Sequence, residues 1–157
     1  MVKIESNEAI LCFETKGAQM TSLKAKDSDF EYLWQPQEGF WQGRNPILFP
    51  LVGSTADKIL HINGKEYTTG NHGFARGSEF AVIDQKDNEI TFRLSDNEET
   101  LKQYPFHFDL DVTYTLEGKE VKVSYLIRNK SEEMMPFTFG LHPAFTCPFD
   151  ENETVKD

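Results

Sequence analysis

The sequence is poor in cysteine. Its 157 residues include two, Cys12 and Cys147, which lie far apart and form neither a CxxC motif nor a zinc-type spacing with histidine. A chain of this length buries about 68–70% of its unfolded surface on folding, so it needs no disulfide for stability. Two reduced thiols in a cytoplasmic protein are therefore the simplest account of the cysteine content.

Long apolar runs and excess positive charge are also missing. The first residues, MVKIESNEAILCFETKG, lack the cationic start and apolar stretch of a signal peptide, and no segment approaches the ~20 apolar residues of a membrane span. Acidic residues outnumber basic ones by 26 to 16, for a formal net charge of −10. Nucleic acids and anionic lipids require a cationic surface, so we expect no nucleic-acid partner and no membrane partner. A small anionic ligand held by one or two arginines is compatible with this charge.

The sequence contains no internal repeat, no linker and no long amphipathic helix. The clearest pattern is the alternation of apolar and polar residues over 106–116, which predicts a strand, and a partner strand is predicted at 121–127. Asn63-Gly64 predicts a β-hairpin, because this dipeptide readily adopts the positive φ angles of a type I′ turn. We therefore expect an all-β fold, an antiparallel β-sandwich or barrel.

Shorter elements complete this expectation. One short helix should begin near Ser95, because a serine followed three residues later by Glu98 has the capping-box spacing, and it should end near Tyr104. Residues 36–46 are predicted to form a long loop by their proline and glycine content, and they lead into a buried run over 47–53. Further strands are expected at 9–13, 18–26, 30–34, 80–83 and 90–94.

Two histidines lie in stretches rich in glycine and aromatic residues: His72 in NHGFARG (71–77) and His142 in GLHPAF (140–145). An imidazole accepts or donates a proton near neutral pH, so both are candidates for acid–base chemistry. A purely structural histidine is the alternative, and it is the commoner outcome for a single histidine. Arg44 and Arg76 are candidate ligand contacts, since a guanidinium offers a planar fork of donors. A surface ion pair is the alternative for Arg44.

Other clusters carry less chemistry. Asp109 and Asp111 share one strand face with His107, and a solvated strand face is the favoured interpretation. Ser54 lacks a GxSxG context, and residues 70–77 do not form a phosphate-binding loop. The dense histidine and glutamate cluster of a cupin metal site is also missing, so we expect no metal.

Four stretches together carry a family resemblance. They are RNPILFP (44–50) with Val52-Gly53, HGFAR (72–76), TLKQYP (100–105) and GLHPAF (140–145). In this order they resemble the aldose 1-epimerase (galactose mutarotase-like) family, in particular the branch that includes LacX-type proteins and hexose-phosphate epimerases. The resemblance implies a large antiparallel β-sandwich whose concave face binds a hexose. It also implies interconversion of anomers without a metal or organic cofactor.

The resemblance also implies residue roles. In the family pattern a glutamate takes the proton from O1 of the sugar, a histidine donates a proton to the ring oxygen O5, and the opened ring closes as the other anomer. By motif, His142 is the acid, His72 bonds sugar oxygens near the reacting centre and Arg44 binds sugar hydroxyls. Arg76 is either a ligand contact or a structural partner of its own loop. The expected partner is a small-molecule sugar or sugar phosphate.

The sequence departs from the pattern after the second histidine motif. The family's glutamate, and an aspartate that also contacts the sugar, lie well downstream, whereas this sequence ends at Asp157. We expect residues 1–157 to be a single domain or the N-terminal portion of a larger β-sandwich domain, with little or no activity alone. Exposed strand edges lead us to expect self-association or a partner fragment. Two alternatives stay open: a carbohydrate-binding or sugar-sensing protein on this scaffold, and a cupin-like metal isomerase.

Overall fold

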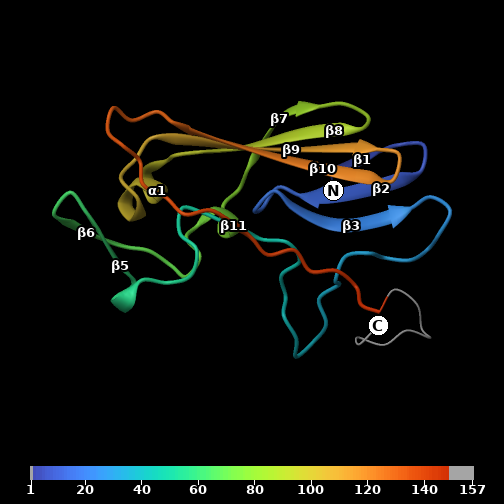
Figure 1. Ribbon diagram of the computed structural model, residues 1–157, viewed down its shortest axis with the longest axis horizontal. Coiled ribbons are helices and arrows are strands. Elements are labelled where there is room, and N and C mark those ends of the chain that lie inside the picture. The colour runs from blue at the N-terminus through green and yellow to red at the C-terminus, as the bar shows by residue number, and fades with distance from the viewer. Residues whose placement is uncertain (1, 149–157) are drawn as a thin grey trace.

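Two antiparallel sheets form the body of the computed structural model, which describes residues 2–148 (Figure 1). The smaller sheet has the strand order β1-β2-β3, and the larger has the order β10-β9-β8-β7. The strands of the first are β1 (Val2–Glu5), β2 (Ala9–Glu14) and β3 (Gln19–Ala25), and those of the second are β7 (Ala81–Gln85), β8 (Glu89–Ser95), β9 (Phe108–Glu117) and β10 (Glu120–Asn129). The antiparallel all-β fold expected from the sequence is confirmed.

Aromatic rings join the two sheets. The ring centroid of Phe13 on β2 lies 5.4 Å from that of Phe92 on β8 and 4.7 Å from that of Tyr114 on β9. The Tyr114 hydroxyl also donates to the carbonyl oxygen of Ala18 at 2.8 Å. Burial raises the pKa of Tyr114, because the phenolate would lose its hydration here. The two sheets therefore share one core, in which each fully buried large side chain contributes about 1.5–3 kcal/mol.

The outer face of the larger sheet differs from the prediction. Asp111 is 6% exposed rather than solvated, and it accepts hydrogen bonds from Arg93 on β8 and Arg128 on β10. A carboxylate tolerates burial when charged donors replace its water. These donors come from both neighbouring strands, so the pattern within β9 alone could not reveal them.

Two local turn signals have different outcomes. The Asn63-Gly64 turn is confirmed, with φ angles of 50° and 75°, between β5 (Ile59–Ile62) and β6 (Lys65–Thr68), and this hairpin projects from the sandwich (Figure 1). The helix α1 (Glu98–Gln103) exists, but its N-cap is Asn97, which forms the capping box with Thr100. Ser95 instead stays in β8, where its hydroxyl donates to Asp109 at 2.5 Å. Because Ser95 pairs with Asp109 in the sheet, the N-cap of the helix lies two residues later than predicted.

The strand expected at 30–34 shrinks to a single bridge, in which Leu33 pairs with Phe145. The Glu31 carboxylate accepts hydrogen bonds from the backbone N–H groups of Leu23 and Leu33. It thus occupies donors that a longer ladder would need. Besides α1, the helical segments among residues 2–148 are two short 3₁₀ turns, Ala56–Lys58 and Ala75–Gly77, and no helix there has the length and apolar character to cross a membrane.

Candidate functional site

Residues 44–53, which we call the central strip, connect the segments that carry the two histidines. The strip contains β4 (Ile47–Leu48), which pairs with β11 (Gly140–Leu141) directly before His142. The backbone N–H of His142 donates to the carbonyl of Pro46 at 3.2 Å. At the other end of the strip, Gly53 contacts His72. Both motif loops are thereby attached to one extended segment.

His72 is held by two hydrogen bonds to Gly53. Its backbone N–H donates to the Gly53 carbonyl at 2.7 Å, and the Gly53 N–H donates to its ring atom Nδ1 at 2.9 Å. Because Nδ1 is an acceptor here, the neutral ring carries its proton on Nε2. The half-buried side chain therefore offers an oriented N–H donor to a ligand oxygen.

The residues after His72 explain the HGFAR motif. The Phe49 carbonyl accepts hydrogen bonds from the N–H groups of Phe74 and Ala75 at 3.1 and 3.2 Å. A Cβ atom on Gly73 would lie 2.3 Å from the Phe49 oxygen, and Gly73 has a φ of +68°. Only glycine fits at this position, because both the space and the backbone conformation exclude a side chain.

His142 has an exposed ring that contacts Trp41. The two ring centroids are 5.0 Å apart with an interplanar angle of 78°. Trp41 is itself held, because the indole N–H of Trp34 donates to its carbonyl at 3.0 Å. Gly43 leaves space for the indole of Trp41, since a Cβ atom on residue 43 would lie 2.5 Å from that ring. The ring nitrogens of His142 make no hydrogen bond to any other residue of 2–148, so they are accessible to a ligand.

Arg44 is half-buried at the start of the central strip. Its backbone N–H and that of Asn45 both donate to Oε1 of Gln19, at 2.9 and 3.0 Å. The guanidinium makes one long contact of 3.5 Å with Gln35, and its Nε atom is buried without a partner among the described residues. Within that part of the chain Arg44 forms no ion pair, so its charge is available to a ligand.

Arg76 is exposed and closes its own loop. Its Nη2 atom donates to the carbonyl of Asn71 at 3.0 Å. The structure thus attaches His72, His142 and Arg44 to the central strip, whereas Arg76 supports the loop from outside. Between residues 2 and 148, no two of these four side chains are in hydrogen-bond contact with each other.

Sequence reasoning missed Trp41 and Gln19. Trp41 is 41% exposed and its neighbour Phe40 is 66% exposed, in a loop rich in glycine and proline. An aromatic pair in such a loop was the available signal, because large aromatic side chains in a soluble domain normally bury most of their area. No sequence pattern indicates a role for Gln19, whose side chain accepts a hydrogen bond from the backbone of Arg44, 25 residues further along the chain.

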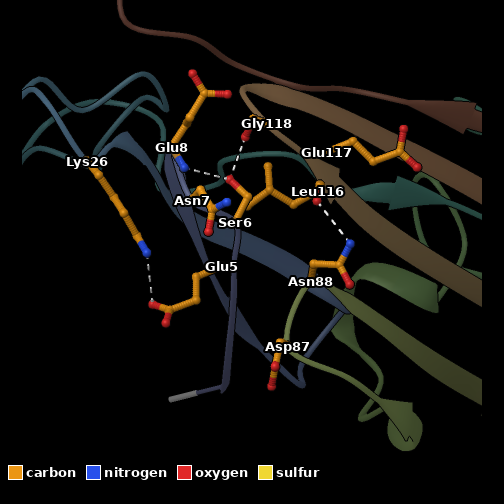
Figure 2. Close-up of a pocket in the computed structure, with 10 residues that line it drawn as sticks. All are labelled: Glu5, Ser6, Asn7, Glu8, Lys26, Asp87, Asn88, Leu116, Glu117 and Gly118. Atoms are coloured by element: carbon orange, nitrogen blue, oxygen red, sulfur yellow. Dashed lines mark hydrogen bonds and ion pairs between the residues drawn. The ribbon is translucent and has the colours of Figure 1, made fainter.

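A separate acidic hollow lies away from the central strip. It has a volume of about 460 Å³ and is formed by the β1–β2, β7–β8 and β9–β10 turns together with Lys26 (Figure 2). The Ser6 hydroxyl donates to the Gly118 carbonyl and accepts from the N–H of Glu8, so its hydrogen bonds are satisfied within the turns. We assign it no ligand. Over residues 2–148, no three His, Cys, Asp or Glu side chains are grouped to hold a metal ion.

The chain is similar to several known proteins. A family model described as aldose 1-epimerase matches residues 2–157. Protein LacX, chromosomal, of Lactococcus lactis subsp. lactis is 38% identical over 162 residues, which span 99% of this chain and 54% of that protein. Human galactose mutarotase is 27% identical over 160 residues, 90% of this chain and 45% of its own.

A solved structure is also similar. The galactose mutarotase related enzyme from Lactobacillus acidophilus superposes with a TM-score of 0.93 at 38% identity, covering 98% of this chain and 51% of that one. The chain thus spans about half the length of the relatives that it matches.

Proposed function

Because the chain belongs to the aldose 1-epimerase family, we propose that it supplies the acid side of a site that interconverts the α and β anomers of a hexose or hexose phosphate. The observation that carries the proposal is that two imidazoles with different hydrogen-bond contacts are both attached to the central strip. His72 is oriented by Gly53 and presents Nε2–H, whereas His142, beside Trp41, has ring nitrogens without a hydrogen bond to any other residue of 2–148.

Each residue has a role in this reaction. Protonated His142 donates a proton to the ring oxygen O5 as the C1–O5 bond breaks, and such a transfer typically contributes about 10²–10⁴-fold. His72 donates a hydrogen bond to a neighbouring sugar oxygen, and Arg44 binds hydroxyl or phosphate oxygens. The exposed face of Trp41 packs against the C–H groups of the sugar ring. Arg76 keeps the His72 loop in shape.

The base of the reaction is a carboxylate that these residues do not provide. Within residues 2–148, neither His72 nor His142 has a hydrogen bond or ion pair to a carboxylate. We assign the base to a glutamate on further polypeptide of the kind that makes up the rest of the longer relatives.

The two cysteines are free and unpaired, and a cytoplasmic location is part of this proposal.

The same observation favours a second candidate. A site with oriented donors and an aromatic face but without a base binds a sugar and leaves its anomeric ratio unchanged. The second candidate is therefore a carbohydrate-binding or sugar-sensing protein on the epimerase scaffold.

NMR spectroscopy separates the two candidates. Saturation-transfer spectra test binding of glucose, galactose and their 6-phosphates to the chain. Exchange spectroscopy measures anomer interconversion in a second sample, to which the part of a relative that this chain does not match has been added. The epimerase proposal expects binding in both samples and catalysed exchange in the second, lost in His142→Asn and kept in Arg76→Lys. Binding without exchange in every sample would establish the second candidate, and no binding at all would exclude both.

A further inference from the structure

Two consecutive backbone N–H groups of the central strip are bonded to side chains from the two motif segments. The N–H of Val52 donates to Oγ1 of Thr138 at 2.7 Å, and the N–H of Gly53 donates to Nδ1 of His72 at 2.9 Å. Thr138 precedes His142 by four residues, so it belongs to the segment that carries the second histidine. Its hydroxyl and the imidazole of His72 are therefore neighbours at one end of the strip.

The backbone of Thr138 is held against the strip as well as its side chain. Its N–H donates to the carbonyl of Pro50 at 2.9 Å. This bond continues the register in which Gly140 pairs with the strip, and the bond from His142 to the strip continues it in the other direction. Residues 138–142 therefore form one extended segment with a fixed register.

Thr138 and His142 lie on the same face of this extended segment, because side chains alternate between the two faces of a strand. The residue between them on that face is Gly140, where a Cβ atom would lie 2.9 Å from Cγ2 of Val52. Four extended residues span about 13 Å. The face thus has a histidine at one end and a threonine at the other, and no side chain of the segment stands between them. This interval has room for one sugar ring.

The hydroxyl of Thr138 has an unused donor. A threonine hydroxyl accepts through its oxygen and donates one hydrogen. The oxygen accepts from Val52, whereas the hydroxyl hydrogen has no acceptor among residues 2–148, and the residue is exposed. Because the bond from Val52 fixes the oxygen, the donor is preorganised for a ligand, which reduces the entropy lost on binding.

We propose that Thr138 is a further sugar-binding residue, whose hydroxyl donates a hydrogen bond to a hydroxyl oxygen of the hexose, an inference that rests on the function proposed above. There His142 acts at the ring oxygen O5. Thr138 is at the far end of the same face, so the oxygen that it contacts is a hydroxyl remote from the C1–O5 bond. Thr138 thereby discriminates between hexoses, since a fixed donor disfavours a sugar that lacks its acceptor.

Ligand-observed NMR with glucose as the probe tests this contact. Thr138→Val removes the hydroxyl with little change of shape and should weaken glucose binding about threefold to tenfold. Thr138→Ser keeps the hydroxyl and should bind glucose as the wild type does. Thr113→Val is the matched control, because it removes a hydroxyl that bonds to Thr91 on the larger sheet, and it should leave glucose binding unchanged.

Deoxy sugars identify the oxygen that Thr138 contacts. The wild-type chain should bind one of the 2-, 3-, 4- and 6-deoxyglucoses more weakly than glucose, and Thr138→Val should abolish that difference. The two changes remove the same hydrogen bond from opposite sides, so their effects are not additive. Additive losses for every deoxyglucose would contradict a direct contact.

The imidazole of His72 separates a sugar contact from a structural role of Thr138. Thr138→Val should keep the melting temperature and the proton on Nε2 of His72, because Val52 is 43% exposed and water can bind its freed N–H. Weaker binding together with a changed His72 tautomer would show that Thr138 acts through His72, which would overturn the proposal.

Two further outcomes distinguish this inference from the proposed function. Equal glucose binding by the wild type and Thr138→Val would refute the contact and leave the proposed function intact. Absence of glucose binding by the wild-type chain would also refute it, and the proposed function would fail as well only if galactose and the 6-phosphates did not bind.

Discussion

Gly53 and His72 hold each other through two hydrogen bonds in opposite directions. The carbonyl of Gly53 accepts from the His72 backbone at 2.7 Å, and its N–H donates to the imidazole Nδ1 at 2.9 Å. The backbone of one residue thereby sets both the orientation and the tautomer of the other's side chain. This relationship distinguishes His72 from a histidine that is merely buried.

The tautomer of His72 is the first prediction. In nitrogen-15 NMR spectra of the neutral ring, His72 should carry its proton on Nε2, because Nδ1 is occupied as an acceptor. The Gly53 amide should exchange slowly with solvent, and His72→Ala should accelerate that exchange. A ring protonated on Nδ1 would contradict the assignment of Nε2–H as the ligand-facing donor.

Gly73 should tolerate no side chain. Gly73→Ala places a Cβ 2.3 Å from the Phe49 oxygen at a φ of +68°, so we expect a loss of about 3 kcal/mol or more in unfolding free energy. The control is Gly70→Ala in the same loop, whose nearest contact would be an ordinary 3.8 Å, with an expected change within about 0.5 kcal/mol. Urea denaturation measures both. Similar losses for the two variants would refute the steric argument.

Asp111 should make stability depend on acid pH. The hydrogen bond from Arg93 lowers the pKa of Asp111 most strongly, burial opposes this effect, and the hydrogen bond from Arg128 adds to the lowering. The folded pKa is thus below the unfolded value of about 3.9, so the stabilisation is present above that pH and is lost as the pH falls through the folded pKa.

Asp111→Asn should therefore cost about 1.5–3 kcal/mol at neutral pH and should flatten the acid limb of the stability curve. Asp27→Asn is the control, because the exposed pair of Asp27 with Lys119 is screened by solvent and its loss should barely change stability. Denaturation series at neutral and acid pH give the comparison. An unchanged acid limb in Asp111→Asn would show that other carboxylates control it.

Trp41 should be required for sugar binding. We expect Trp41→Ala to weaken hexose binding about tenfold or more, since it removes the aromatic face beside His142. Phe40→Ala removes the adjacent and more exposed ring and should have little effect. Ligand-observed NMR provides the affinities, and the His142 ring resonances should shift in Trp41→Ala alone. Equal losses in both variants would point to the loop rather than to Trp41.

Much of the fold follows from patterns within single segments. The alternation over 106–116 and the Asn63-Gly64 turn encode β9 and the β5–β6 hairpin locally, because side-chain period and turn geometry depend on neighbouring residues. The motif residues His72, His142 and Arg44 could likewise be selected as candidates from the sequence.

Contacts across the fold could not be predicted in this way. The pairing of Asp111 with Arg93 and Arg128 requires the strand order β10-β9-β8, and the support of Arg44 by Gln19 requires the first residue of β3 to meet the strip. The N-cap also moved from Ser95 to Asn97, since the sheet retained Ser95. Each of these results depends on which elements become neighbours, and a single sequence does not specify that.

The two bonds between Gly53 and His72 also close the base of an excursion. Residues 54–71, including the projecting β5–β6 hairpin, leave the central strip at Gly53 and return to it at His72 (Figure 1). The cost of closing a loop grows slowly with its length. A change in the length of this excursion therefore leaves its base closed but alters the contacts of its tip, where Asn63 Nδ2 donates to Glu133 at 2.7 Å and Ile62 packs against the core.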